Sequence, residues 1–154
     1  MLRVSKLTDY ATVVLAQMAR EPEKVHTASD LAEQTSLARP TVAKLLKKFV
    51  HGGLLVSYRG AHGGYLLARS PGEISAVDII DTVEGQFAMT ECSLGHDQCD
   101  LEQVCSIGHH WQRINGMIRT ALDEVSLADL ATPAAIPLRR LDFSRAIGRD
   151  AQAN

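Results

Sequence analysis

Long apolar runs are missing from this sequence. No stretch of about 18 uncharged apolar residues is present, and the first nine residues lack the apolar core of a signal peptide. Disorder is also excluded, because 45% of the residues are hydrophobic and only 22% are charged. The 154 residues therefore predict one compact domain, or a small domain with an appendage, in a cytoplasmic protein without a membrane partner.

Acidic residues are scarce in the first half of the chain. Residues 1–70 contain ten Lys and Arg against five Asp and Glu, a balance of +5, whereas residues 71–154 contain six against thirteen, a balance of −7. The two balances sum to the net charge of −2. Local positive charge attracts polyanions, so the first half is a candidate nucleic-acid surface; an unevenly charged, solvated surface is the alternative.

Apolar residues at helical spacing alternate with turn residues in this half. The spacing predicts a helix over 8–20 with Thr8 as its N-cap. A short second helix starts at Thr27 and, after a break, a basic third helix starts near Pro40 and ends at Gly52. Helix, short helix, turn and basic helix form the order of a helix-turn-helix unit.

A glycine-rich hairpin follows the basic helix. The runs Leu54–Tyr58 and Tyr65–Ala68 are strand-like, and the segment between them contains four small residues. Ser75 then caps a helix that stops at Gly85. We therefore predict a mainly α fold in which residues 1–85 form a winged helix-turn-helix with a β-hairpin wing.

In such a fold the second helix of the pair enters the major groove, and the wing contacts the neighbouring groove of double-stranded DNA. The candidate DNA contacts are polar side chains of the two helices and the wing: Ser29, Arg39, Thr41, Lys44, Lys48, Arg59 and His62. The alternative is a helix pair docked on a hairpin, with lysines that are merely solvated.

All three cysteines, Cys92, Cys99 and Cys105, lie within fourteen residues, in a stretch (86–106) that lacks sustained periodicity. Their gaps are wider than those of zinc-finger knuckles, and an odd number argues against a disulfide framework. Three thiolates in one loop are compatible with an iron–sulfur cluster, of the 2Fe–2S or 4Fe–4S type, but also with zinc or a thiol switch. Candidates for the remaining ligand are His96, His109, His110 and Asp9.

A long helix is predicted over 104–130, because apolar residues recur three and four apart over nearly three heptads. The small first domain offers this apolar stripe little surface to pack against. We therefore expect the stripe to join two copies of the chain. The candidate dimer contacts are Trp111, Ile114, Ile118 and Val125. Residues 131–154, rich in alanine and interrupted by proline, predict a disordered tail.

Residues 1 to about 130 resemble the Rrf-type winged-helix iron–sulfur regulators, a family of transcription factors. The resemblance rests on the opening Leu2-Arg-Val-Ser-Lys-Leu-Thr-Asp-Tyr-Ala11, on Gly53-Leu-Leu-Val-Ser-Tyr-Arg-Gly-Ala-His-Gly-Gly-Tyr-Leu-Leu67 and on the cysteine triad. Trp111, six residues after the last cysteine, and the segment 126–130 extend it. The opening most resembles the regulators of the proteobacterial SUF system.

The resemblance implies a homodimer that binds a palindromic operator, holds one cluster per subunit and represses cluster-assembly genes. In the Isc regulator of this family the fourth ligand is a histidine three residues after the last cysteine, where this chain has Gly108 and then His109. In the nitric-oxide-sensitive Nsr repressor it is an aspartate in the first helix, supplied by the partner subunit. Asp9 occupies the matching place, so the resemblance favours Asp9, with His109 as the alternative.

Three other functions are alternatives to a cluster sensor for SUF-type genes. A winged-helix regulator with zinc or a reversible disulfide keeps the DNA binding but not the cluster, and a nitric-oxide-responsive repressor keeps both. An enzyme with a cysteine nucleophile is disfavoured, because no catalytic signature and no Gly-x-x-x-x-Gly-Lys motif are present.

Overall fold

A computed structural model of the chain describes residues 4–93 and 107–132. It is mainly α with one two-stranded antiparallel sheet, as the sequence predicts. Its helices and strands, in chain order, are α1 (Lys6–Ala19), α2 (Ala28–Thr35), α3 (Arg39–His51), β1 (Leu55–Tyr58), β2 (Gly64–Leu67), α4 (Ala76–Glu84), α5 (Gly108–Asp123) and α6 (Leu127–Ala131). Two single turns of 3-10 helix, η1 (Pro71–Glu73) and η2 (Glu91–Ser93), lie on either side of α4 in the sequence.

The first three helices and the hairpin share one apolar core, to which α4 and α6 also contribute. The buried stripes of α1 and α3 are the predicted ones, and every member is at most 1% exposed: Ala11, Val14, Leu15, Met18, Val42, Leu45, Leu46 and Phe49. Both stripes follow the three- and four-residue spacing of an amphipathic helix, which places their side chains on one face. The core therefore lies where the sequence periodicity predicts it.

The start of α1 corrects one sequence prediction. The helix begins at Lys6, and the Ser5 hydroxyl accepts hydrogen bonds from the backbone N–H groups of Leu7 (3.2 Å) and Thr8 (3.3 Å). Ser5 is therefore the N-cap, and Thr8 is not. Thr8 is instead buried and donates its hydroxyl to the carboxylate of Glu84, a contact from another helix that local spacing does not reveal.

The other predicted helix boundaries in the first half agree with the structure. Thr27 caps α2 by accepting a hydrogen bond from the Asp30 N–H at 3.2 Å, and Ser36 ends it in the left-handed conformation, with φ of 56°. Pro40 lies in the first turn of α3. The strands pair with Leu55 opposite Leu67 and Tyr58 opposite Gly64, which fixes the register of the wing.

The helix predicted over 104–130 is divided in the structure; residues 104–106 lie outside the described part. The first helix, α5, ends at Asp123, and α6 begins after Ser126, whose hydroxyl accepts a hydrogen bond from the Asp129 N–H at 3.1 Å. The Leu127 N–H donates to the Ile74 carbonyl at 2.7 Å, which anchors α6 to the residues between η1 and α4, and α6 packs against α1. A capping box and a tertiary contact thus override apolar spacing that continues through the break.

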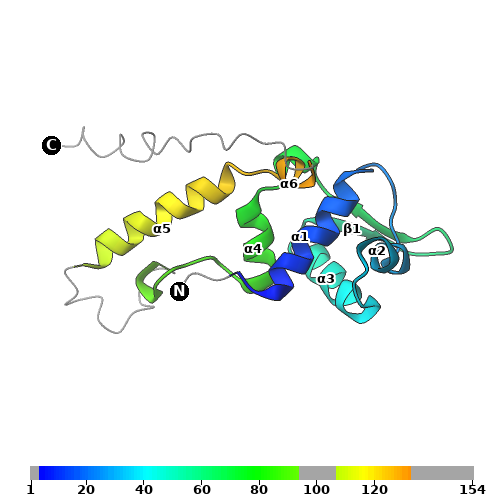
Figure 1. The fold of residues 1–154 in the computed structure, drawn as a ribbon, viewed down its shortest axis with the longest axis horizontal. Coiled ribbons are helices and arrows are strands. Elements are labelled where there is room, and N and C mark those ends of the chain that lie inside the picture. The colour runs from blue at the N-terminus through cyan, green and yellow to red at the C-terminus, as the bar shows by residue number, and fades with distance from the viewer. Residues whose placement is uncertain (1–3, 94–106, 133–154) are drawn as a thin grey trace.

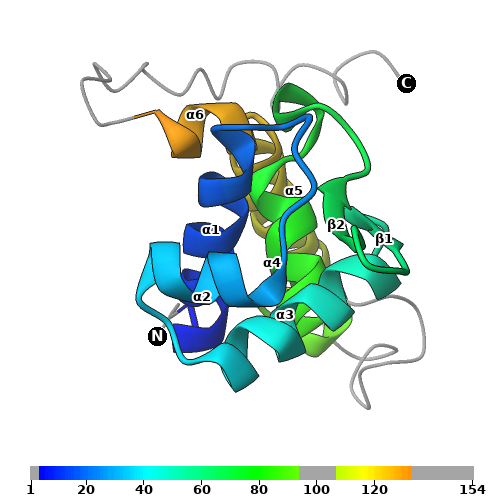
Figure 2. The same ribbon diagram turned by 90° about the vertical axis from the view of Figure 1, so that its right-hand side faces the viewer.

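Helix α4 stands between α5 and the group formed by α1–α3, and α5 extends away from that group (Figures 1 and 2). Ser75 caps α4 as predicted, by accepting a hydrogen bond from the Asp78 N–H at 3.2 Å. Within residues 4–93 and 107–132, none of the helices has the length and apolar character that a bilayer crossing requires.

Candidate nucleic-acid interface

The two faces of α3 differ in chemistry. One face is the fully buried stripe. Lys44 and Lys47 are exposed on the opposite face, and Arg39 is exposed at the first residue of the helix. Thr41 is half-buried, and Ser29 is exposed on α2. The core therefore holds α3 by its apolar side and leaves its basic side open, which is the presentation that a recognition helix needs.

No acidic residue opposes this basic side in the local sequence. Between Glu33 and Glu73 the chain contains no Asp or Glu, and this interval spans the turn, α3 and the whole hairpin. Phosphate groups would therefore meet positive charge without a neighbouring carboxylate from the same elements.

The wing is fixed to the helices at its base. His26, between α1 and α2, exchanges two backbone hydrogen bonds with Tyr65 of β2, at 2.9 and 2.8 Å. The approach is close: a Cβ at Gly64 would lie 2.5 Å from the His26 carbonyl oxygen. Arg59 and His62 are exposed in the loop that joins β1 to β2, so the structure places both at the wing tip.

Lys48 differs from the other predicted DNA contacts. Its side chain is half-buried, and Nζ donates a hydrogen bond to the carbonyl oxygen of Val83 at 2.8 Å. This carbonyl lies at the C-terminal end of α4, where a cation is favoured by the helix dipole. Lys48 thus joins α3 to α4, a contact that the lysine spacing in the sequence does not indicate.

The candidate cluster ligands lie largely outside the described part of the chain. Cys99, Cys105 and His96 fall between residues 94 and 106, and of Cys92 only the backbone, in η2, is described. Asp9 is exposed in the first turn of α1, and His109 and His110 are exposed at the start of α5. Among the residues the structure describes, no group of three His, Cys, Asp or Glu side chains is placed to hold a metal ion.

The predicted dimer contacts fall into two groups. Trp111 and Ile114 are 36% and 39% exposed on α5, together with Ile107 at 56%. Ile118 and Val125 are half-buried within their own chain. The Val125 carbonyl accepts a hydrogen bond from the Ala76 N–H at 2.8 Å, at the start of α4. The free apolar surface is therefore concentrated in the first half of α5.

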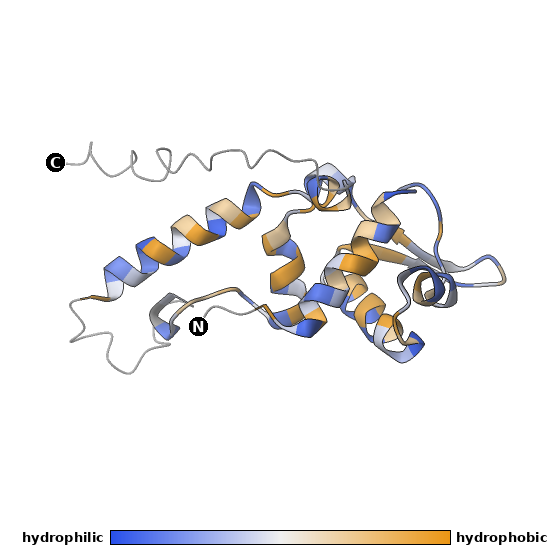
Figure 3. Ribbon diagram, in the orientation of Figure 1, coloured by the Kyte–Doolittle hydropathy of each residue, from blue (hydrophilic) through white to orange (hydrophobic). Residues whose placement is uncertain are grey.

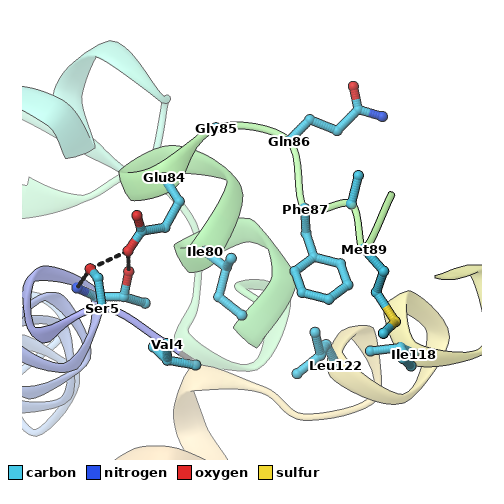
Figure 4. Close-up of a pocket in the computed structure, with 12 residues that line it drawn as sticks. Val4, Ser5, Ile80, Glu84, Gly85, Gln86, Phe87, Met89, Ile118 and Leu122 are labelled. Atoms are coloured by element: carbon cyan, nitrogen blue, oxygen red, sulfur yellow. Dashed lines mark hydrogen bonds between the residues drawn. The ribbon is translucent and has the colours of Figure 1, made fainter. Parts of the chain in front are cut away.

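A groove of about 460 Å³ lies where α1, α4 and α5 meet. Figure 4 shows Ile80, Phe87, Ile118 and Leu122 lining it, with Glu84 at one side. The pKa of Glu84 is held below its ordinary value because the hydroxyls of Ser5 and Thr8 donate hydrogen bonds to its carboxylate. These hydrogen bonds join α4 to the start of α1, and no local sequence pattern indicates them.

Together, the helix pair, the acid-free basic face and the anchored wing define a winged helix-turn-helix DNA-binding protein. The family described as "Rrf2: Iron-dependent Transcriptional regulator" matches residues 4–133. The chain belongs to this Rrf2 family of transcriptional regulators. It is a DNA-binding regulator and not an enzyme.

Individual relatives agree with this assignment. The chain is 30% identical to protein aau3 of Rhizobium meliloti over 123 residues, which are 79% of this chain and 75% of that protein. Among solved structures, CymR of Bacillus subtilis, the global cysteine regulator of that organism, is 29% identical with a TM-score of 0.65, over 85% of this chain and 97% of that one. IscR of T. potens is 28% identical with a TM-score of 0.60, over 84% and 85%.

Proposed function

We propose that this protein is a homodimeric repressor that senses an iron–sulfur cluster and controls genes for SUF-type cluster assembly. The observation that carries the proposal is the triad Cys92, Cys99 and Cys105, placed directly before a helix with an exposed apolar stripe. Sensor ligands and dimer surface are therefore neighbours in the chain. The description of the matching family as iron-dependent supports the same function.

The donor set fits such a cluster. Thiolates are the usual ligands of iron–sulfur clusters, and three of them leave one position for another group. Asp9 and His109 are both exposed, so each is accessible to a cluster carried by a partner subunit or by the same chain. When bound, the cluster would supply a crosslink that is sensitive to iron supply and oxidation. We assign the fourth position to Asp9, with His109 as the alternative.

Dimer geometry connects the cluster to DNA. Two recognition helices must be set one helical turn of DNA apart to read a palindromic operator. The described start of the loop, η2, packs on α5, which carries Trp111 and Ile114. A crosslinked loop therefore restrains the helix that sets the distance between the two α3 helices, and its loss shifts the population of dimers able to bind.

The cluster is tested by oxygen-free purification and spectroscopy. We expect brown protein with sulfide-to-iron absorption, and operator affinity that differs between cluster-bound and cluster-free protein. Asp9→Ala should change the spectrum, whereas Asp30→Ala, which removes an exposed carboxylate from the first turn of α2, should not. If His109→Ala changes the spectrum and Asp9→Ala does not, the fourth ligand is His109.

Colourless protein that contains stoichiometric zinc, or that stays metal-free after reconstitution with iron and sulfide, would overturn the cluster proposal. A reversible change in operator affinity with thiol oxidation would then identify a redox switch. An operator response to nitric oxide alone, with no response to iron supply, would identify the nitric-oxide-responsive repressor.

The DNA surface is tested separately. Lys44→Ala and Arg59→Ala should weaken operator binding, and removing a lysine that contacts phosphate should lower the salt slope by about 1. Lys24→Ala is the matched control, because Lys24 is exposed between α1 and α2 and bonds to Glu21 at 2.7 Å. An unchanged slope for Lys44→Ala, with unchanged affinity for Arg59→Ala, would contradict the assignment of this face.

A further inference from the structure

The segment that leads into the cysteine-bearing loop is held by three side chains. The Phe87 N–H donates to Asp81 Oδ1 at 2.6 Å, and the Phe87 carbonyl accepts from Arg119 Nη1 at 3.2 Å. The Met89 N–H donates to Asn115 Oδ1 at 3.1 Å. Two backbone N–H groups, two residues apart and just before η2, are therefore fixed by side chains of α4 and α5.

Asp81 and Arg119 also bind each other. Arg119 Nη2 lies 2.8 Å from Asp81 Oδ2, and Nη1 lies 3.2 Å from Oδ1, so the pair is bidentate. About a third of each side chain is exposed, and Asp81 raises the pKa of Arg119. Bidentate pairs of this kind fix orientation as well as distance. The pair joins α4 to α5 directly.

Asn115 is the buried residue of α5, at 6% exposure. A buried amide that makes no hydrogen bond destabilises the fold, so the Asn115 side chain needs its hydrogen bond to the Met89 N–H. By contrast, Trp111, one turn before Asn115, and Ile114, directly before it, are both exposed. The buried polar side chain of this helix thus accepts a hydrogen bond from the backbone of segment 87–89.

The same turn of α4 that holds the segment also holds α3. Asp81 faces the segment and Arg119, whereas the next two residues contact the recognition helix. A Cβ at Gly52 would lie 2.6 Å from Thr82 Cγ2, so the C-terminal end of α3 packs closely against α4. Lys48 then bonds to the carbonyl of Val83. Segment 87–89 and the recognition helix α3 therefore contact consecutive residues of one helix, α4.

We propose that Asp81, Asn115 and Arg119 are positioning residues that couple segment 87–89, which precedes the cysteine-bearing loop in the sequence, to the recognition helix α3 through α4. The inference rests on the proposed function, because it names the residues that transmit the state of the loop. Coupling between sites is carried by chains of packed side chains and hydrogen bonds. Asp81 and Arg119 form such a chain between Phe87 and α4, and Asn115 holds Met89 on α5.

The test uses Arg119→Gln and Asn115→Leu in the full-length protein, with Arg113→Gln as the matched control. Arg113 is an exposed arginine of the same helix. The first measurement is hydrogen exchange of the cluster-free protein. We expect the Met89 amide to exchange about tenfold faster in Asn115→Leu than in wild type or control, because this variant removes its acceptor. We expect the same of the Phe87 amide in Arg119→Gln, because this variant removes the partner that orients Asp81.

The second measurement is the ratio of operator affinities with and without the cluster. Typical coupling factors are about 5- to 150-fold, and we expect the ratio to fall toward one in both variants while iron content and dimer assembly stay at the wild-type level. Arg119→Lys, which keeps the charge but not the bidentate geometry, should retain an intermediate ratio.

Folded variants that exchange like wild type at these amides, or that keep the full ratio, would overturn the inference alone. A wild-type ratio of one would overturn the proposed function, and with it the coupling. Because the wild type and the variants are measured side by side, the two failures are distinguishable.

Discussion

The DNA-binding region and α5 distribute their apolar side chains in opposite ways. In α1 and α3 the large apolar residues are inside, with Leu15 and Phe49 at 0% exposure. On α5, Trp111 and Ile114 are more than a third exposed while Asn115 is buried. Figure 3 shows hydrophobic bands along α5 where it extends away from the other helices.

This contrast separates apolar side chains that one chain buries by itself from apolar side chains that it leaves exposed. An apolar core closed within one chain stabilises the fold by itself, whereas a contiguous exposed apolar patch marks an interaction site. Substitutions in the two regions should therefore be detected by different measurements. Those in the core change the free energy of unfolding, and those on α5 change assembly.

The largest effect is expected from Phe49→Ala. Among the residues that the structure describes, Phe49 is the largest of the fully buried side chains. Its truncation leaves a cavity and should lower the free energy of unfolding by about 3–5 kcal/mol. Denaturant titration at fixed protein concentration measures this change. Lys47→Ala, on the exposed side of the same helix, should stay within about 0.5 kcal/mol of wild type. Equal losses for both would contradict the two-faced description of α3.

Trp111→Ala should act on assembly instead. An aromatic residue at the centre of a dimer surface typically contributes about 2 kcal/mol or more to association, which is roughly a thirtyfold change in the dissociation constant. Sedimentation over a range of protein concentrations measures it, with Arg113→Ala as the exposed control on the same helix. A wild-type protein that is monomeric, or a Trp111→Ala dimer of unchanged affinity, would show that this stripe does not join two copies.

The core was predictable from the sequence because it is encoded locally. Apolar spacing gives the buried stripes, and Thr27, Ser75 and Gly52 mark helix boundaries by their own backbone chemistry. The break between α5 and α6 was missed because apolar spacing continues to Val125. The local signal for it was the capping box of Ser126 and Asp129, and a tertiary bond to Ile74 fixes the next helix.

The candidate site shows the same division. The basic face of α3 and the wing tip were predictable from the local order of the elements. The contact of Lys48 with α4 was not, because it is a hydrogen bond to a carbonyl 35 residues away in the sequence. The pair of Asp81 and Arg119 is separated by 38 residues and has no periodic signature. Contacts between distant segments are set by packing, so sequence periodicity does not reveal them.

Gly52→Ala tests the contact between α3 and α4. The expected effect is smaller than that of Phe49→Ala. The added Cβ would lie 2.6 Å from Thr82 Cγ2 and 3.1 Å from Thr82 Cβ, so either the Thr82 side chain or the two helices must shift. Overpacking of this kind costs about 1–3 kcal/mol, measured as a loss in the free energy of unfolding. Gly72→Ala is the control, because nothing lies within 4 Å of the added atom. A second variant, Gly52→Ala with Thr82→Ser, should recover part of the loss.

The smallest effect concerns pH and the contact between α4 and the start of α1. Hydrogen bonds from Ser5 and Thr8 lower the pKa of Glu84 from its ordinary value of 4.5. A carboxyl whose pKa is lower in the folded state stabilises that state above the unfolded pKa, and the contribution disappears as the pH falls through the folded pKa. Because Glu84 is exposed, solvent screening keeps the effect small.

Glu84→Gln removes this titration and isolates its contribution. The difference in unfolding midpoint between wild type and Glu84→Gln should be largest near neutral pH and should shrink as the pH falls below 4.5, since protonated Glu84 and glutamine are both neutral. Glu33→Gln, an exposed substitution on α2, controls for the general loss of one negative charge. If both differences follow the same pH course, Glu84 acts only through net charge, and α4 is held to α1 by its apolar contacts alone.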